Sequence, residues 1–265
     1  MSLFFDLFNT LRRPNGWALA TWFNLMLRYR RTFLGPLWMV ARPLAFVAFL
    51  GALFVGLSNF TSSEFIPHMT IGFICWTLLG GYLGRSDIVF ARNKAFLLDG
   101  RRKHTDIVVM DNAELILHFL HQVIIIVAVV IFYKTIDSFY ALMSIVGLAI
   151  VLLMGFFVTI IFGILGSRFK DIGQMIASIN GIAFLATPII WMPQLSEVPK
   201  GRRDILSAYL DYNPFYHYLE LIRAPLMGNP ITQYTWTFVG VGTTLAAIIA
   251  AILYHRTRHL IVFWI

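Results

Sequence analysis

Residues 138–167 read SFYALMSIVGLAIVLLMGFFVTIIFGILGS, a stretch without one charged side chain. The hydrocarbon core of a bilayer is about 30 Å thick, and a helix that crosses it needs roughly 20 apolar residues. This stretch is long enough, and we expect a membrane span over residues 140–166.

The composition of the whole chain also indicates a protein that is embedded in the bilayer. The 265 residues are 58% hydrophobic and only 13% charged, and the mean hydropathy is +0.75. A soluble protein of this composition would need a core far larger than its surface permits, so the bilayer is the expected solvent. No polar extension has the size of a domain, and we predict a single transmembrane domain over residues 1–265 without room for a second, catalytic one.

Five further segments are apolar and long enough to span, so the predicted fold is an all-α integral membrane protein with six transmembrane helices. The predicted spans cover residues 35–57, 65–84, 107–133, 140–166, 173–194 and 231–254. The third has four ionisable side chains toward its first half: Asp111, Glu114, His118 and His121. Its membrane part is therefore expected to begin near Leu115.

The Lys and Arg residues predict the orientation. If both termini lie on one side, that side holds fifteen of the 21 basic residues, the other side holds five, and Arg42 lies within the first span. The positive-inside rule then places both termini in the cytoplasm. The net charge of +8 suggests nucleic acid in a soluble protein. Here the basic residues flank apolar segments, and anionic lipid headgroups explain them better.

The N-terminal 34 residues are predicted to be cytoplasmic and to contain an interfacial helix. Asn15 is its expected N-cap, and one face carries Leu19, Trp22, Phe23, Met26 and Leu27. Simple membrane anchoring is the alternative role. The first residues carry an acid, Asp6, and their basic pair follows the apolar part, so we expect no cleaved signal peptide.

Residues 195–230 are predicted to form an external gate region. Pro188, Pro193 and Pro199 break the fifth helix near its outer end. Two amphipathic pieces follow, over 203–210 and 215–227, and both are too short to span. We expect re-entrant or lid helices packed against protein or water.

Several kinds of chemistry have no motif in this sequence. There is no G-x-x-x-x-G-K-[ST] phosphate loop, so no ATP hydrolysis of that type is expected, and no catalytic residue is predicted. His118 and His121 lie three apart but lack a third ligand nearby, so packing or interfacial histidines are favoured over a metal site. The sole cysteine, Cys75, excludes a disulfide within the chain.

The acids argue against an ion-coupled transporter, which needs a carboxylate well inside a span. All of these are expected at span ends or in loops: Asp87, Asp106, Asp111, Glu114, Asp171 and Glu220.

Arginines surround the start of the first span, in the stretch RYRRTFLGPLWMVARP at residues 28–43. We call Arg28, Arg30, Arg31 and Arg42 the basic collar. Arg42 lies seven residues into the span, roughly 10 Å deep by the helical rise. It either snorkels to the interface or contacts an anion in a polar pathway.

Aromatic residues are abundant, and most are expected in lipid-facing or belt positions. A subset in the second span, Phe73, Trp76 and Tyr82, could instead line a path for sugars, whose C–H faces suit aromatic rings.

Five stretches resemble, in the same order, motifs of the permease subunits of type-2 ABC exporters for bacterial polysaccharides. They are RYRRTFLGPLWMVARP (28–43), SRFKDIGQM (167–175), TPIIWMP (187–193), NPFYHYLELIRAPLMG (213–228) and RHLIVFWI (258–265). They cover the chain nearly from end to end. TPIIW and the closing FWI are most similar to the O-antigen (lipopolysaccharide) export branch, and capsule and teichoic acid exporters remain alternatives.

The resemblance implies a bacterial inner-membrane homodimer bound to two copies of a separate ATP-binding subunit, which would carry ATP and Mg; this chain would need no cofactor. The substrate would be an undecaprenyl-type, lipid-diphosphate-linked polysaccharide, whose headgroup the basic collar would recruit. Residues 17–31 are similar to the interface helix of that family.

The resemblance also implies two groups of site residues. The loop 85–104 corresponds to a coupling helix that docks on the ATPase, with Arg85, Asp87, Arg92, Lys94, Asp99 and Arg101 as candidates. The external gate would include Pro188, Trp191, Tyr209, Asn213, Pro214, Tyr216 and Arg223. A drug or small-lipid exporter, a secondary transporter and an intramembrane enzyme are the rival functions.

Overall fold

The computed structural model describes residues 3–57, 61–100, 102–135, 138–193 and 200–265. Every regular element within these ranges is a helix, which confirms the predicted all-α class. Five of the described segments are long and apolar enough to cross a membrane. They contain α3 (Trp38–Leu57, preceded by the 3-10 turn η1, Gly35–Leu37), α4 (Ser62–Ser86), α7 (His104–Tyr133), α8 (Ser138–Arg168) and α12 (Gln233–Thr257).

The fifth predicted span is shorter than expected. Helix α9 covers Asp171–Ala186, 16 residues, or about 24 Å at 1.5 Å per residue. It ends because Pro188 disfavours helical geometry at the residue before it, and Thr187 is extended, with φ −86° and ψ 137°. The predicted bound at residue 194 is therefore wrong for the helix, and the count of six spans stays a prediction.

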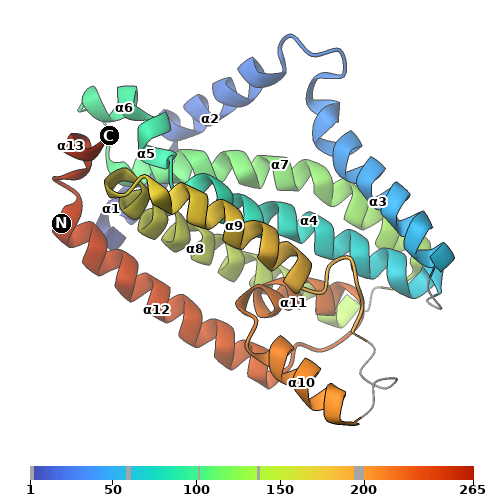
Figure 1. The fold of residues 1–265 in the computed structure, drawn as a ribbon. Helices are drawn as coiled ribbons and strands as arrows, with labels where there is room; N and C mark the ends of the chain where they lie inside the picture. Colours follow the sequence, from blue (N-terminus) through green and yellow to red (C-terminus); the bar gives the residue numbers. More distant parts are fainter. Residues whose placement is uncertain (1–2, 58–60, 101, 136–137, 194–199) are drawn as a thin grey trace.

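The two ends of the bundle carry different short elements (Figure 1). Both termini lie at one end, which we call the terminal end, together with α1 (Leu3–Arg12), α5 (Val89–Arg92), α6 (Lys94–Leu98) and α13 (Ile261–Trp264). The opposite end, which we call the gate end, carries α10 (Lys200–Asp211) and α11 (Pro214–Leu226). Helices thus form in both predicted parts of the gate region; their re-entrant character stays a prediction.

Helix α2 (Pro14–Tyr29) is the predicted interfacial helix, but it begins earlier than expected. Arg13 precedes it and Pro14 is its first residue, a position where the missing N–H of proline costs nothing. Asn15 is therefore not the N-cap. Thr21 faces α7, where its hydroxyl donates to the Met110 carbonyl at 3.2 Å. The apolar side of α2 is exposed instead, as an interfacial helix requires.

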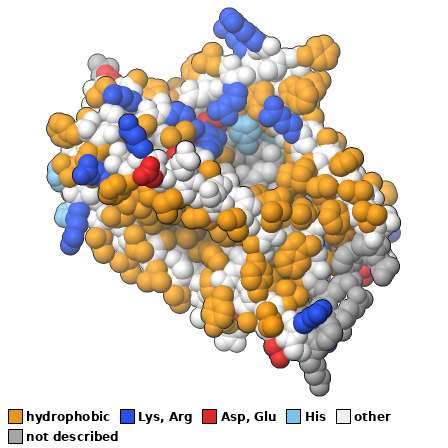
Figure 2. Space-filling model, viewed as in Figure 1, with side chains coloured by type: hydrophobic (Ala, Val, Ile, Leu, Met, Phe, Trp, Pro, Cys, Tyr) orange, Lys and Arg blue, Asp and Glu red, His pale blue; other side chains and the backbone are white. Residues whose placement is uncertain are grey.

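Helix α8 lies close to its neighbours through glycines. A Cβ atom on Gly147 would lie 2.3 Å from the Leu221 carbonyl oxygen of α11, and one on Gly155 would lie 2.4 Å from the Tyr82 ring of α4. Small residues allow such close approach between membrane helices. Buried apolar side chains of α4, α7, α8 and α11 pack together in one hydrophobic core around these close contacts. The outer faces are apolar, and Figure 2 shows them covering most of this side of the molecule.

Candidate functional site

Five charged side chains from four helices meet between the terminal end and the middle of the bundle. Arg28 comes from α2, Arg85 from α4, Arg92 from α5, and Asp111 and Glu114 from α7. We call them the charge cluster. The cluster joins residues up to 86 positions apart in the chain. No local sequence motif therefore predicts it.

The charges alternate along the cluster. The Arg85 Nη2 atom lies 3.2 Å from Asp111 Oδ1 and 3.0 Å from Glu114 Oε2. Arg92 forms an ion pair with Asp111, and Arg28 forms one with Glu114. The order is Arg28, Glu114, Arg85, Asp111 and Arg92, so a continuous path of opposite charges leads from α2 to α5.

Because the two carboxylates of the cluster are buried, they require positively charged partners. The side chains of Asp111 and Glu114 are only 3% and 7% exposed, whereas Arg28 is 45% exposed. A buried carboxylate is tolerated when arginines pair with it. Burial, and after it repulsion from Arg85, lowers the pKa of Arg92 to about 10. Arg92 nevertheless remains charged at neutral pH, and the cluster carries three positive and two negative charges.

The two acids of the charge cluster lie in the first half of α7, and their expected place at the end of the membrane part of that helix stays a prediction. Helix α7 begins at His104, three residues before the predicted span, so these two acids lie in its third and fourth turns, and both are buried. The reason is tertiary, because the arginines that neutralise them come from three other helices.

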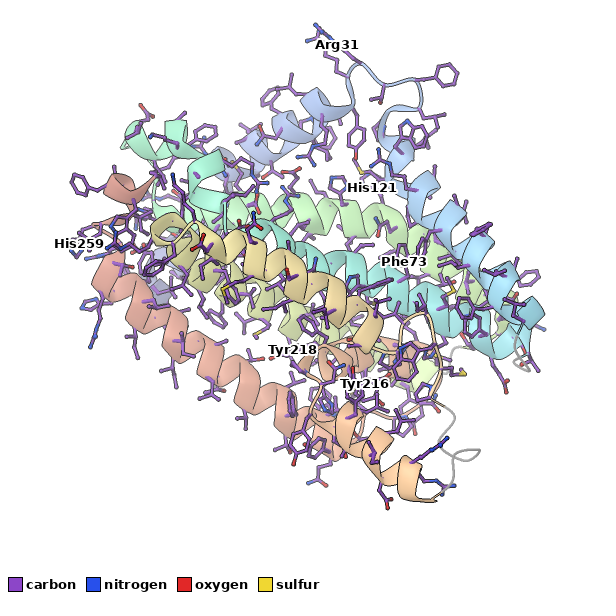
Figure 3. The ribbon with its side chains drawn as sticks, viewed as in Figure 1. Arg31, Phe73, His121, Tyr216, Tyr218 and His259 are labelled. Atoms are coloured by element: carbon purple, nitrogen blue, oxygen red, sulfur yellow. The ribbon has the colours of Figure 1, made fainter. Side chains whose placement is uncertain are left out.

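Only one residue of the basic collar belongs to the charge cluster. Arg30 and Arg31 follow α2 and are exposed, and Figure 3 shows Arg31 pointing away from the bundle. Arg42 is exposed on α3, with its guanidinium carbon 5.7 Å from the centre of the Trp38 ring. Of the four predicted substrate-binding arginines, the structure therefore places Arg28 alone in the cluster.

His118 and His121, two of the three histidines of α7, make separate contacts. His118 Nε2 lies 3.4 Å from Arg28 Nη1, and the His121 Nδ1 atom donates to the Leu117 carbonyl at 2.7 Å. Figure 2 shows basic side chains around a hollow on this side, with a histidine in its wall. Among the described residues, no group of three or more His, Cys, Asp or Glu could hold a metal ion.

The predicted coupling loop contains α5 and α6. Arg85 and Arg92 lie in the charge cluster. Lys94 Nζ donates to the Ile265 carbonyl at 2.9 Å, which ties α6 to the C-terminus. The backbone of Asp87 lies against α8, where a Cβ atom on Gly166 would be 2.3 Å from its carbonyl oxygen. Asp99 lines a cavity described below, and Arg101 lies outside the described residues.

The predicted channel aromatics are packed inside the chain. Trp76 and Tyr82 are buried. Phe73 is half-buried and stacks on Phe46 of α3 at 3.9 Å between ring centres, and Figure 3 shows it in the middle of the bundle. The edge of Phe73 also contacts Phe184 of α9. These rings therefore join α3, α4 and α9 within this chain.

A second polar site holds the end of α9 at the gate end. The buried Arg223 of α11 donates from Nε to Glu220 Oε1 at 2.9 Å, and its Nη1 donates to the Pro188 carbonyl. The His68 Nε2 atom of α4 lies 3.1 Å from Arg223 Nη1 and 3.2 Å from the Trp191 carbonyl oxygen. Arg223 and His68 together bind the chain just after α9 ends. The importance of His68 was not predicted from the sequence, since its partners are 120 or more positions away.

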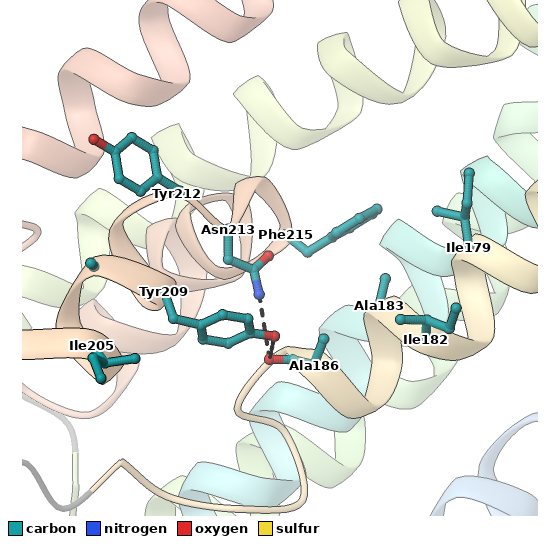
Figure 4. Close-up of a pocket in the computed structure, with 10 residues that line it drawn as sticks. Ile179, Ile182, Ala183, Ala186, Ile205, Tyr209, Tyr212, Asn213 and Phe215 are labelled. Carbon is teal, nitrogen blue, oxygen red and sulfur yellow. Dashed lines mark hydrogen bonds between the residues drawn. The ribbon is translucent and has the colours of Figure 1, made fainter. Parts of the chain in front are cut away.

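Helix α10 is fastened to the same end of α9 (Figure 4). The Tyr209 hydroxyl donates to the Ala186 carbonyl at 2.7 Å, and Asn213 Nδ2 donates to Thr187 Oγ1 at 3.3 Å. Between α9 and α10 lies a mainly apolar cavity of about 540 Å³. Ala183 of α9 and Phe215 of α11, which line this cavity, also pack in the main hydrophobic core.

Asn213 also begins α11. Its Oδ1 accepts from the Tyr216 backbone N–H at 3.2 Å, and Pro214 is the first helical residue. Burial, and then the charge of Glu220, raises the pKa of Tyr216 to about 12, so its hydroxyl stays protonated. Figure 3 shows Tyr216 and Tyr218 on α11.

The sequence matches the model of a known protein family. The family model described as "ABC-2 type transporter" matches residues 16–227, from α2 to the end of α11. The chain belongs to the ABC-2 type transporter family. It is therefore a multi-pass membrane subunit of an ABC exporter, and an ATP-binding subunit is its partner. No curated protein matches the sequence.

In this ABC-2 permease, the charge cluster joins the interfacial helix α2 to the short helix α5. It reaches from α2, at the start of the matched region, to α5 in the loop predicted to contact the ATP-binding subunit. A displacement of α5 would alter the pairing of Arg92 and, through Asp111 and Arg85, that of Glu114. The cluster thus connects α5 at the terminal end with α4, α7 and α2 through ion pairs.

Proposed function

We propose that this ABC-2 permease exports a lipid-diphosphate-linked polysaccharide of O-antigen type. The observation that carries the proposal is the series of exposed arginines at the end of α2, directly after it and near the start of α3, of which Arg28 also belongs to the charge cluster. The planar guanidinium forks of arginine pair with phosphate oxygens. The five motifs that resemble polysaccharide exporters support the same substrate class.

The proposed mechanism involves no covalent chemistry on this chain. ATP binding by the partner subunit closes it against α5 and α6, and the charge cluster passes the movement to α2, α4 and α7. The membrane helices then shift between two states, closed and open. The end of α9, held by Arg223 and Tyr209, is the proposed gate.

The assembly proposed here is a homodimer with two copies of the ATP-binding subunit, which hydrolyses ATP with Mg. The channel lies at the dimer interface, and both termini face the cytoplasm of a bacterium across its inner membrane. The concentration of basic residues at the terminal end supports this orientation.

The alternatives differ in substrate. Capsule and teichoic acid exporters share the same plan, and a small-lipid or drug exporter would need a narrower lateral site. Asp111 and Glu114 are buried acids of the kind that an ion-coupled transporter uses to carry its ion. Each acid is instead engaged in ion pairs with arginines, the arrangement of a structural charge network rather than of a free proton carrier.

The first test is purification of the tagged protein from its native membrane in mild detergent, followed by mass spectrometry. We expect a near-equimolar ATP-binding protein to co-purify. The complex is then reconstituted, and ATP hydrolysis is measured with a lipid-diphosphate polysaccharide and with the same polysaccharide lacking the diphosphate lipid. Stimulation by the first alone supports the proposed substrate. No stimulation by candidate polysaccharides, with stimulation by small lipids or drugs, would overturn it.

A further inference from the structure

A cavity of about 680 Å³ lies at the terminal end, bordered by α1, the start of α2 and the residues that lead into α7. Its wall differs from that of the apolar cavity beside α10. It contains three cationic side chains, Arg13, Arg102 and Lys103, and two aromatic ones, Phe5 and Trp17. None of these residues belongs to the charge cluster or to the gate.

Two of the charged groups in this region are already satisfied. Lys103 Nζ pairs with Asp6 at 2.6 Å. Both carboxylate oxygens of Asp106 accept hydrogen bonds, from the Thr10 hydroxyl at 2.5 Å and from the Lys103 backbone N–H at 2.9 Å. Asp106 is thus committed to holding α1 on the start of α7.

Arg13 and Arg102 are not neutralised in this way. Arg102 Nη1 donates to the Gly16 carbonyl at 3.1 Å, and its guanidinium lies 4.7 Å from the centre of the Phe96 ring. Within the described part of the chain, no carboxylate forms an ion pair with either arginine. Asp99 also lines the cavity, but the cations outnumber the acids.

The cavity adjoins the start of a membrane-crossing helix and an exposed apolar helix face. Lys103 directly precedes α7, which is one of the membrane-crossing helices. Helix α1 exposes Phe4, Phe8 and Leu11, as expected for a helix whose apolar face contacts acyl chains. An arginine pair beside such a face meets phosphate oxygens at the level of the headgroups.

We propose that this cavity binds an anionic glycerophospholipid such as phosphatidylglycerol. Arg13 and Arg102 hold the phosphate, Trp17 and Phe5 border the headgroup, and the acyl chains run along the exposed face of α1. The bound lipid fastens α1 and the start of α2 to α7. The site is separate from the proposed polysaccharide pathway and does not depend on the exported substrate.

The test measures lipid binding to the complex of the full chain with its ATP-binding subunit. Native mass spectrometry counts the lipids retained, and the midpoint of thermal unfolding is followed with short-chain phosphatidylglycerol, short-chain phosphatidylcholine and inorganic phosphate. At about 100 times the Kd, phosphatidylglycerol is expected to raise the midpoint by roughly 5 °C. The other two additives are expected to leave it unchanged.

The variant Arg13→Gln/Arg102→Gln removes both positive charges but keeps a side-chain donor for the Gly16 carbonyl. We expect it to lose the shift with phosphatidylglycerol. The matched control is Arg12→Ala/Arg256→Ala, which removes two exposed positive charges that do not line the cavity. It is expected to keep the shift.

Four outcomes would overturn the proposal. Equal shifts with both lipids would mean that the headgroup charge is not recognised, and an equal shift with inorganic phosphate would mean a site for the free ion. Equal loss in both double variants would indicate only surface charge. If the Gln variant kept the lipid shift but lost the ATP-binding subunit, the cavity would belong to the subunit interface. Because lipid binding is measured directly, a wrong polysaccharide assignment would leave this result intact.

Discussion

At the scale of single residues, Glu114 is the side chain on which the charge cluster depends. It is buried on α7, and it pairs with Arg28 of the interfacial helix and with Arg85 of α4. Removing its charge leaves both arginines short of a partner. Since both are partly exposed, water recovers part of the loss.

We predict that Glu114→Gln lowers stability by about 1–2 kcal/mol, less than the 3–5 kcal/mol of a fully buried pair. The midpoint of thermal unfolding should fall by roughly 3–6 °C, and stimulation of ATP hydrolysis by substrate should weaken. The control is Glu64→Gln, which changes an exposed carboxylate in α4. Equal effects of the two substitutions would show that the cluster has no special role.

Arg223 presents the opposite case, a guanidinium that is 2% exposed. Arg223→Leu leaves Glu220 without its partner and the Pro188 carbonyl without its donor, and we predict a loss of about 3–5 kcal/mol. The double variant Arg223→Leu/Glu220→Leu removes the orphaned charge and should recover part of the stability. Thermal unfolding of both variants measures this. A double variant as unstable as the single one would mean that the unpaired acid is not the cause.

At the scale of elements, the contact between α8 and α11 depends on a missing side chain. Gly147 lies against the backbone of Leu221, and backbone atoms cannot move aside as a flexible side chain can. By contrast, a Cβ atom on Gly181 of α9 would meet nothing within 4 Å.

We therefore predict opposite effects of the same substitution at these two glycines. Gly181→Ala should be neutral or stabilising by up to about 1 kcal/mol, because alanine restricts the unfolded chain. Gly147→Ala should destabilise the protein by about 1–3 kcal/mol through overpacking. Thermal unfolding in detergent compares them directly, and a neutral Gly147→Ala would show that α11 is free to move away from α8.

At the scale of the whole molecule, the orientation in the membrane can be tested with the native cysteine in place, because Cys75 is buried. Tyr212→Cys introduces an exposed thiol at the gate end, and Arg256→Cys introduces one at the terminal end. We predict that a membrane-impermeant maleimide labels Tyr212→Cys in intact cells, and Arg256→Cys only after permeabilisation. The reverse pattern would invert the proposed topology.

The sequence by itself determined the solvent of this protein, its helical class and the approximate bounds of five membrane helices. These features depend on length and composition within one segment, and the transfer of an apolar helix into a bilayer is decided locally. The proline-rich break after α9 and the helices of the gate region are local as well. Resemblance of short motifs also pointed to an ABC-2 permease, which the family match confirms; the polysaccharide branch stays a proposal.

Only the tertiary structure decided which charges meet. Arg28 and Glu114, or Arg223 and His68, are far apart in the chain, and their pairing follows from how the helices pack. Burial of Asp111 and Glu114 is possible only because arginines from three other helices neutralise them, which no single segment reveals. The cavity with Arg13 and Arg102 likewise exists only where α1, α2 and α7 meet, since a binding site made of distant segments is a property of their packing.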